Sequence, residues 1–453
     1  MLEGDNADQG VELRGEIMGN LGDSLFQQGR FKEAETVLGE ALALLEPRFR
    51  ETASYGVVLH SLANLSSAKQ DNERTVALLE KSLGSFKADQ RTATDADTLV
   101  DVLHDLGTGY NLLHKYWDAE KTLREAIALQ QRAYGGSDLS YSAMQSELAN
   151  VLERAGKYDD ALTALAEATR VTKASKADVA KVVLLGNRID LGYTLLDMGD
   201  VEQAGAVAKD VLGLITENVE SRRPDYLLRG YGVMVRYLEA IGSYREARAY
   251  IGKEERLVEQ RLSGGPQIKG RILLQVGRVA LEEGDLDAAE KALVDAAGSA
   301  PAGEGGIIDS VANVARRSIG VIQLERGKPS EALPILERQL QEFDAQEDQR
   351  KTPREEAELR LLNGRALLAS GRPVEAKADL ERAYLLLRSQ HPASPWLAEA
   401  QIRLAECLLQ LGDVGRAREL VDQARAIHAA HKELGEHFRR PLHAIEKKLT
   451  NYA

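Results

Sequence analysis

The sequence predicts an all-α protein, a solenoid of about ten helix–turn–helix repeats, and three columns of residues predict it. They are a turn residue that is mostly glycine, a small residue seven positions before it, and an alanine five positions after it. In the stretch Leu21–Leu42 these three are Gly29, Gly22 and Ala34. Columns that keep one spacing along most of a chain indicate an internal repeat.

The turn column recurs at intervals of 41 to 44 residues, and eight of its ten members are glycine. Glycine adopts the left-handed conformation at little cost, which suits the end of a helix before a tight turn. Small residues in the other two columns let antiparallel helices approach closely. Each hairpin then has an apolar face that only a neighbouring hairpin can bury, so the repeats must stack. The turn residues are Gly29, Gln70, His114, Gly156, Gly199, Gly242, Gly284, Gly327, Gly371 and Gly412.

These columns resemble the tetratricopeptide repeat (TPR), most clearly in the stretches Leu106–Leu129 and Leu148–Ala168. The resemblance covers roughly residues 15 to 427 and implies a right-handed superhelix. A period near 42 exceeds the usual 34 of the family and is similar to the extended repeats of kinesin light chains and bacterial regulators. The stretch Ala424–Leu442 resembles C-terminal tails of bacterial Ser/Thr protein kinases that carry TPRs. Without a kinase signature, this chain would be the non-catalytic part of such a protein.

Along the chain, residues 1–14 are predicted to be a disordered tail and residues 15–432 the TPR solenoid. Residues 433–453 are predicted to be a C-terminal capping helix, because their apolar residues share one helix face. Charged or Gly/Pro-rich stretches predict joints near residues 220–225, 263–267 and 299–306.

Composition narrows the classes of function. The net charge of −13 opposes nonspecific binding to nucleic acid or to anionic membranes. The sequence has no apolar run long enough for a membrane span, no secretion signal and no nucleotide-binding or hydrolase signature, so we expect a cytoplasmic, non-enzymatic protein without cofactors. Cys407 is expected to be a buried, inert thiol. His428 and His431 could share a helix face and bind a metal, but a solvated helix end is the favoured interpretation because no third ligand is suitably spaced.

The predicted binding surface follows from the resemblance, because in TPR solenoids the first helix of each repeat lines the concave groove. Residues six and thirteen positions before the turn then project inward together, since seven residues make almost two helical turns. Repeats six and seven carry arginine at these four positions, Arg229, Arg236, Arg271 and Arg278, and later repeats add Arg316, Arg317 and Arg365. The sequence predicts a basic pocket for an acidic or carboxylate-bearing peptide, since arginine binds carboxylate bidentately. The alternative is that the arginines pair with neighbouring Asp and Glu side chains.

In the N-terminal half the equivalent positions include Asn64 and Asn150, and an amide can hold a peptide backbone because it both donates and accepts. The other groove positions there include Asp23, Thr108 and Tyr193. The function expected from these features is a protein-interaction scaffold that binds a peptide or partner protein, as the docking or regulatory part of a bacterial signalling protein. Two alternatives stay open: a ligand-sensing module whose superhelical pitch changes on binding, and a self-assembly module.

Overall fold

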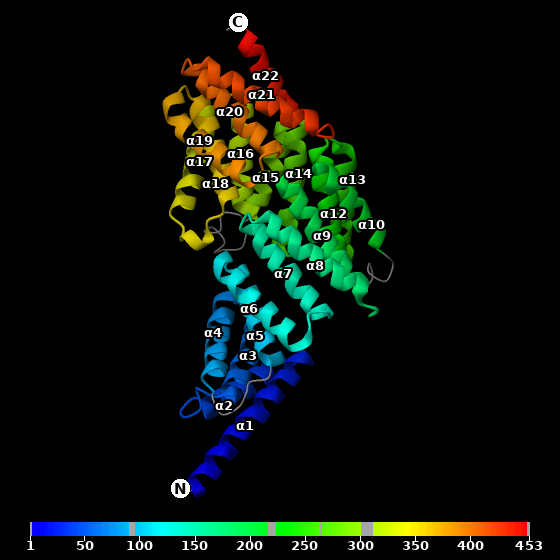
Figure 1. Ribbon diagram of the computed structural model, residues 1–453, viewed down its shortest axis with the longest axis vertical. Helices are drawn as coiled ribbons and strands as arrows, with labels where there is room; N and C mark the ends of the chain where they lie inside the picture. Colours follow the sequence, from blue (N-terminus) through cyan, green and yellow to red (C-terminus); the bar gives the residue numbers. More distant parts are fainter. Residues whose placement is uncertain (1, 90–95, 216–222, 263–264, 300–310, 451–453) are drawn as a thin grey trace. The chain divides into compact units, whose positions relative to one another are not determined.

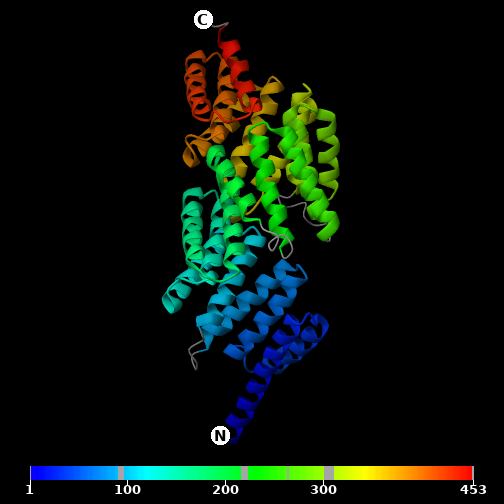
Figure 2. The same ribbon diagram turned by 90° about the vertical axis from the view of Figure 1, so that its right-hand side faces the viewer.

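The computed structural model describes residues 2–89, 96–215, 223–262, 265–299 and 311–450 (Figure 1). In these ranges the regular secondary structure is helical, and no strand occurs among them, as the sequence predicts. Consecutive helices form antiparallel hairpins that stack along the chain (Figures 1 and 2). The predicted helix–turn–helix solenoid is therefore confirmed.

The chain divides into two compact units, and each is described by itself. Unit 1 comprises residues 1–154 and 166–175, and unit 2 comprises residues 155–165 and 176–453. The fourth hairpin contributes to both. The helices of the first four hairpins are α1 (Leu2–Gln27), α2 (Phe31–Leu45), α3 (Ala53–Ala68), α4 (Asn72–Ala88), α5 (Ala96–Leu112), α6 (Tyr116–Tyr134), α7 (Leu139–Arg154) and α8 (Tyr158–Ala174).

The remaining hairpins pair α9 with α10, α12 with α13, α14 with α15, α16 with α17, α18 with α19 and α20 with α21. Their bounds are α9 (Ala180–Met198), α10 (Val201–Leu214), α12 (Pro224–Ala240), α13 (Tyr244–Arg261), α14 (Pro266–Glu283), α15 (Leu286–Gly298), α16 (Val311–Glu325), α17 (Pro329–Asp344), α18 (Pro353–Ala369), α19 (Pro373–Gln390), α20 (Pro395–Gln410) and α21 (Val414–Ala430). A short 3-10 turn, Asp348–Arg350, precedes α18, and α22 (Glu436–Leu449) closes the chain.

All ten predicted turn residues have a positive φ, between 58° and 94°. The two that are not glycine, Gln70 and His114, have φ values of 61° and 58°. The turn therefore keeps its left-handed conformation at these two positions, although a side chain makes that conformation energetically unfavourable. The register of the repeat, rather than the residue type alone, determines the conformation.

The paired columns make the close helix contact that they predict. A Cβ at Gly22 would lie 2.3 Å from Leu38, and a Cβ at Gly107 would lie 2.6 Å from Leu123. Ala34 and its equivalents in the later repeats that keep alanine are fully buried between the helices of their hairpins. The interior is close-packed at these points, so a larger residue would push the two helices apart.

The structure has a helix at each end of the described chain. Residues 2–14, which the sequence predicts to be a disordered tail, lie in α1. At the other end α22 buries Leu442, Ile445 and Leu449 against α20 and α21, in agreement with a capping helix. The predicted joints fall wholly or partly outside the described residues, at 220–222, 263–264 and 300–306.

Candidate partner-binding surfaces

The first helices of neighbouring hairpins contact one another at several steps of the solenoid, among them α1 with α3, α5 with α7 and α12 with α14. We call the side of each unit that these first helices form its inner face. The predicted groove residues lie on these helices. The predicted arginines of unit 2 and asparagines of unit 1 therefore all belong to first helices.

Three of the four predicted inner-face arginines pair with carboxylates of the preceding repeat. Arg229 pairs with Asp190. The guanidinium of Arg236 lies 2.5 Å from Asp197, and that of Arg278 lies 2.8 Å from Glu239. Each arginine follows its acid by 39 residues. These contacts correspond to the intrachain pairing that the sequence leaves open as the alternative to an anion pocket.

Arg271 differs from the other three, because it is exposed and makes no hydrogen bond or ion pair with any residue that the structure describes. Near it, the carboxyl of Glu254 is almost fully buried. Burial raises the pKa of Glu254 to about 8, against the opposing effects of a hydrogen bond from Gln275 and the charge of Arg271. At neutral pH Glu254 therefore holds its proton, which leaves the positive charge of Arg271 available to a ligand.

Tyr193 lies where the arginines of α12 and α14 come closest. Its ring centroid is 5.7 Å from the Arg236 guanidinium, and its hydroxyl donates to the backbone carbonyl of Arg229 over 3.2 Å. Burial raises the pKa of Tyr193, and the charges of Arg236, Arg271 and Arg229 oppose that shift. The charges of three of the four predicted arginines thus act on Tyr193, and Arg278 is not among them.

The other predicted arginines lie in later repeats and are engaged there. The Arg316 guanidinium donates to Asn313 over 2.6 Å, and the nearly buried Arg317 lies 3.5 Å from Glu358. Arg365 lies 3.1 Å from Glu325 and 3.5 Å from Glu399. Burial, together with the neighbouring Arg403 charge, lowers the pKa of Arg365.

The inner face of unit 1 has a different chemistry. Asn150 accepts a hydrogen bond from Asn111 over 3.0 Å, and the same Asn111 amide donates to Glu147 over 3.0 Å. The half-buried Asn64 makes no side-chain hydrogen bond with the described residues. His60 lies 2.8 Å from Asp105 of the next repeat. The sequence prediction does not include His60, Asp105 or Asn111, although all three lie on first helices, His60 and Asp105 between the two predicted columns and Asn111 three residues before the turn.

Unit 2 also contacts itself over long stretches of sequence, through the turns of hairpins four, five and six. A Cβ at Gly156 would lie 2.7 Å from the Gln390 side chain, and a Cβ at Gly199 would lie 2.5 Å from Pro395. At the sixth turn, the backbone N–H of Gly435 donates to the carbonyl of Ala240 over 2.9 Å. The turn glycines therefore provide close approach here, in addition to their left-handed conformation.

Side-chain contacts reinforce the self-contact of unit 2, one near the turns of hairpins four and five and one near the turn of hairpin six. The Arg354 guanidinium lies 2.6 Å from Asp197 and 3.4 Å from the Tyr158 hydroxyl. The Tyr244 hydroxyl lies 2.9 Å from Nδ1 of His437. Burial lowers the pKa of His437 to about 4 and raises that of Tyr244 to about 12, so both groups are neutral when they share this hydrogen bond.

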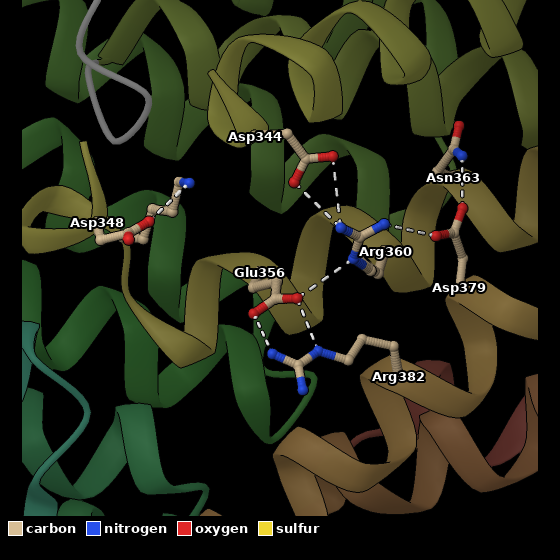
Figure 3. A network of polar contacts seen from close by, with 8 residues as sticks. Asp344, Asp348, Glu356, Arg360, Asn363, Asp379 and Arg382 are labelled. Atoms are coloured by element: carbon tan, nitrogen blue, oxygen red, sulfur yellow. Dashed lines mark hydrogen bonds and ion pairs between the residues drawn. The ribbon is translucent and has the colours of Figure 1, made fainter. Parts of the chain in front are cut away.

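A network of ion pairs joins α17, α18 and α19 and is structural (Figure 3). Arg360 lies 3.0 Å from Asp344, 2.9 Å from Asp379 and 3.3 Å from Glu356. Arg382 donates two hydrogen bonds to Glu356, of 2.7 and 2.8 Å. Each charge faces opposite charges from a neighbouring helix, so the network fixes the stacking of hairpins eight and nine.

Residues singled out for other chemistry are placed as follows. Cys407 is fully buried and donates to the carbonyl of Pro373 over 3.2 Å, and burial raises its pKa, as expected for an inert thiol. His428 is buried rather than solvated, and burial lowers its pKa. His431 is held by Glu433 and by the carbonyl of Ala393. Among the described residues no three His, Cys, Asp or Glu side chains converge as a metal site would require.

The model of the MalT-like TPR region matches residues 92–387, and two further tetratricopeptide-repeat models match residues 15–46 and 367–434. A curated relative is the RxLR effector protein SFI4 of Phytophthora infestans (strain T30-4), 23% identical over 217 residues, which are 45% of this chain. The chain spans 62% of the length of that relative. In the described ranges, no helix combines the length and the apolar character that a membrane crossing needs.

Solved structures with the same kind of fold share little sequence with this chain. A putative kinesin light chain of Podosopora anserina with nearly identical TPR-like repeats is 19% identical, covering 47% of this chain and 98% of its own, with a TM-score of 0.38. The apo form of the quorum sensor NprR from B. thuringiensis is 12% identical, covering 93% of this chain and 99% of its own, with a TM-score of 0.43. BtubC (BKLC) from P. vanneervenii is 16% identical, covering 51% and 90%, with a TM-score of 0.41.

Proposed function

The chain belongs to the tetratricopeptide-repeat family, with a MalT-like TPR region, and from this premise we propose that it is a non-enzymatic scaffold that binds a peptide or partner protein on its inner faces. The observation that supports this most is the inner face of unit 1. Its described side-chain contacts join neighbouring repeats, as between His60 and Asp105, which lie 45 residues apart. We propose that the polar side chains of this face hold a partner.

The polar groups of that face suit an extended peptide. Asn64 offers an amide that can donate to a peptide carbonyl and accept from a peptide N–H. Asn150 lies two repeats further along the same column, with one of its acceptor positions taken by Asn111. Carboxylates at Asp105 and Glu147 alternate with these amides. A peptide with an exposed backbone and basic or neutral side chains fits this surface best.

The acidic-peptide hypothesis applies to unit 2 and depends on Arg271. Arg229, Arg236 and Arg278 already contact carboxylates, so an acidic ligand there would have to displace Asp190, Asp197 or Glu239. Arg271 is the accessible member of the predicted patch. We propose the chain as the docking or regulatory part of a larger signalling protein, supported by the resemblance of its C-terminal stretch to kinase tails.

The test is selection of binding peptides from an unbiased display library on the full chain, followed by affinity measurement with two matched variants. Asn64→Ala combined with Asn150→Ala should weaken the selected peptides at least tenfold while leaving the helical content unchanged. Arg271→Ala is the control on unit 2 and should not affect them. Selected peptides that bind the asparagine double variant with full affinity would disprove docking on unit 1. Dependence on Arg271 instead would support the acidic-peptide hypothesis.

A further inference from the structure

Arg354 occupies an unusual place for an arginine. It lies in the first turn of α18, after the N-cap residue Thr352. A cation in the first turn opposes the helix macrodipole, whereas Glu355 and Glu356 beside it complement that dipole. Helix stability therefore does not explain Arg354, and the reason for it must lie in what the side chain contacts.

That contact forms a small site within unit 2. The Arg354 guanidinium lies 2.6 Å from Oδ1 of Asp197, near the end of α9, and 3.4 Å from the hydroxyl of Tyr158, at the start of α8. The Tyr158 ring packs on His391, with 4.7 Å between the ring centroids. Asp197 is 11% exposed, and its charge raises the pKa of Arg354 well above the usual value. A carboxylate and a phenol hydroxyl, both contacted by one terminal nitrogen of Arg354, together make a receptor for a guanidinium.

A second arginine contacts the same carboxylate oxygen of Asp197. Arg236, from the next repeat, lies 2.5 Å from Oδ1 of Asp197. Arg236 comes from the helix stacked directly beside α9, so that pair forms wherever the two hairpins stack. The charge of Asp197 stays compensated if Arg354 leaves, which makes the Arg354 contact the one that can be exchanged.

The Arg354 contact belongs to the self-contact of unit 2 described above. Close to it, Gly199 meets Pro395 and Gly156 meets Gln390, both too tightly for an added Cβ. These contacts bring hairpins four and five onto α18, α19 and α20. The contacts that close unit 2 thus include the side chain of Arg354, whose place another arginine can take.

We propose that Asp197 and Tyr158 form a guanidinium-binding site, filled by Arg354 in the closed form of unit 2, and that an arginine presented by a partner protein replaces Arg354 and opens the unit. The partner is defined by this chemistry as a protein segment with an exposed arginine. Lysine fits the site less well, because its compact ammonium is more strongly hydrated than a guanidinium and loses more solvation on entering this largely buried site. The inference concerns unit 2 and does not depend on docking at unit 1.

The site is tested with N-acetyl-arginine amide as the probe, using the full chain. Arg354→Gln empties the site, so this variant should bind the probe at least tenfold more tightly than the unmodified chain. N-acetyl-lysine amide should bind it several-fold more weakly. Arg338→Gln is the matched control, because Arg338 is an exposed arginine of α17 whose partner is Glu342 of the same helix. It should behave like the unmodified chain.

The carboxylate and the opening are tested separately. Adding Asp197→Asn to Arg354→Gln should abolish probe binding, and Tyr158→Phe in the same background should weaken it without risk to the fold. Full binding by both double variants would overturn the site. Small-angle scattering should show a larger radius of gyration for Arg354→Gln, and for the unmodified chain saturated with probe. Probe binding with an unchanged radius of gyration would overturn the opening.

Discussion

The inner faces of the two units are built from the same repeat, yet they differ in how far apart in the sequence their interacting side chains lie. In unit 1 the Asn111–Asn150 and His60–Asp105 contacts each join neighbouring repeats. In unit 2 arginines and carboxylates alternate from repeat to repeat, and contacts such as Arg354–Tyr158 and Tyr244–His437 join residues 196 and 193 apart. Unit 2 thus uses part of its inner face for contacts between distant stretches of its own chain.

The comparison shows that one set of residues determines the shape of this repeat protein and another set determines the chemistry of its inner faces. The columns that define the hairpin are common to both units, so they cannot distinguish them. What differs is the residue type at the inner positions, and whether the solenoid returns to itself. Variants in unit 2, each with a counterpart in unit 1, test this contrast.

The largest expected effect is on the pH dependence of unit 2. Glu254 has a pKa of about 8 in the folded chain, raised by burial above the usual 4.5. Between these values the folded state keeps a proton that the unfolded state releases. The free energy of unfolding should therefore fall as the pH rises through this window, by up to about 1.4 kcal/mol per pH unit. Glu254→Gln should flatten that slope, measured by hydrogen exchange of α13 and α14 between pH 5 and 8.

The counterpart in unit 1 is Glu35, whose pKa is lowered by its hydrogen bond from Lys69. It titrates below the window, so Glu35→Gln should leave the slope of α2 and α3 unchanged between pH 5 and 8. Glu282, with a pKa raised to about 7 by burial and by the charge of Glu239, adds its own part to the slope below pH 7. The part between pH 7 and 8 is therefore the one that Glu254→Gln should remove. A slope there that survives Glu254→Gln would assign it to another group.

The second prediction compares two turn glycines of the same backbone type. Gly199 and Gly29 have φ values of 85° and 74°, so alanine at either pays the left-handed penalty, about 1 kcal/mol. A Cβ at Gly199 would also lie 2.5 Å from Pro395, whereas nothing lies within 4 Å of a Cβ at Gly29. Gly199→Ala should therefore destabilise its unit by roughly 3 kcal/mol in total, with overpacking supplying the larger part.

Urea unfolding with a spectroscopic reporter in each unit measures both variants. If Gly199→Ala costs no more than Gly29→Ala, the turn of hairpin five does not press against α20 in solution. The self-contact of unit 2 would then be too loose to close the unit. Equal and large losses in both variants would instead attribute the cost to backbone strain alone.

The hairpins of both units were predictable because their causes are local. The left-handed turn, the small residue at Gly22 and the alanine at Ala34 act within one hairpin, and the period repeats them. Gln70 and His114 have positive φ although their residue types disfavour it, because the register of the repeat places them at the turn. The arginine pairs of unit 2 were also within reach of the sequence, since each arginine follows its acid by the same 39 residues.

The contact of Arg354 with Asp197 was not predictable in this way. It depends on small rotations between hairpins that accumulate over several repeats before the two residues meet. No spacing rule in the sequence encodes that sum. The helical start of α1 was missed for a different reason: a polar, glycine-containing stretch reads as a tail, although it continues the helix that packs on α2.

The smallest expected effect compares an ion pair from each unit. In unit 2 the Glu239 carboxylate is 9% exposed and is compensated by Arg278. Arg278→Gln keeps a hydrogen-bond donor but leaves a nearly buried charge without its cation, and should destabilise unit 2 by roughly 2 kcal/mol. In unit 1 Lys69 and Glu35 are 50% and 46% exposed, so Lys69→Gln should cause no measurable change.

The double variant Arg278→Gln with Glu239→Gln separates charge from packing. If the loss in Arg278→Gln comes from the uncompensated carboxylate, removing that carboxylate should restore most of the stability. If the loss persists, the arginine stem rather than its charge holds α12 and α14 together. In the first case the arginines of unit 2 serve mainly to neutralise their own inner face, and the acidic-peptide hypothesis then depends on Arg271 alone, because only this arginine has no carboxylate to give up among the described residues.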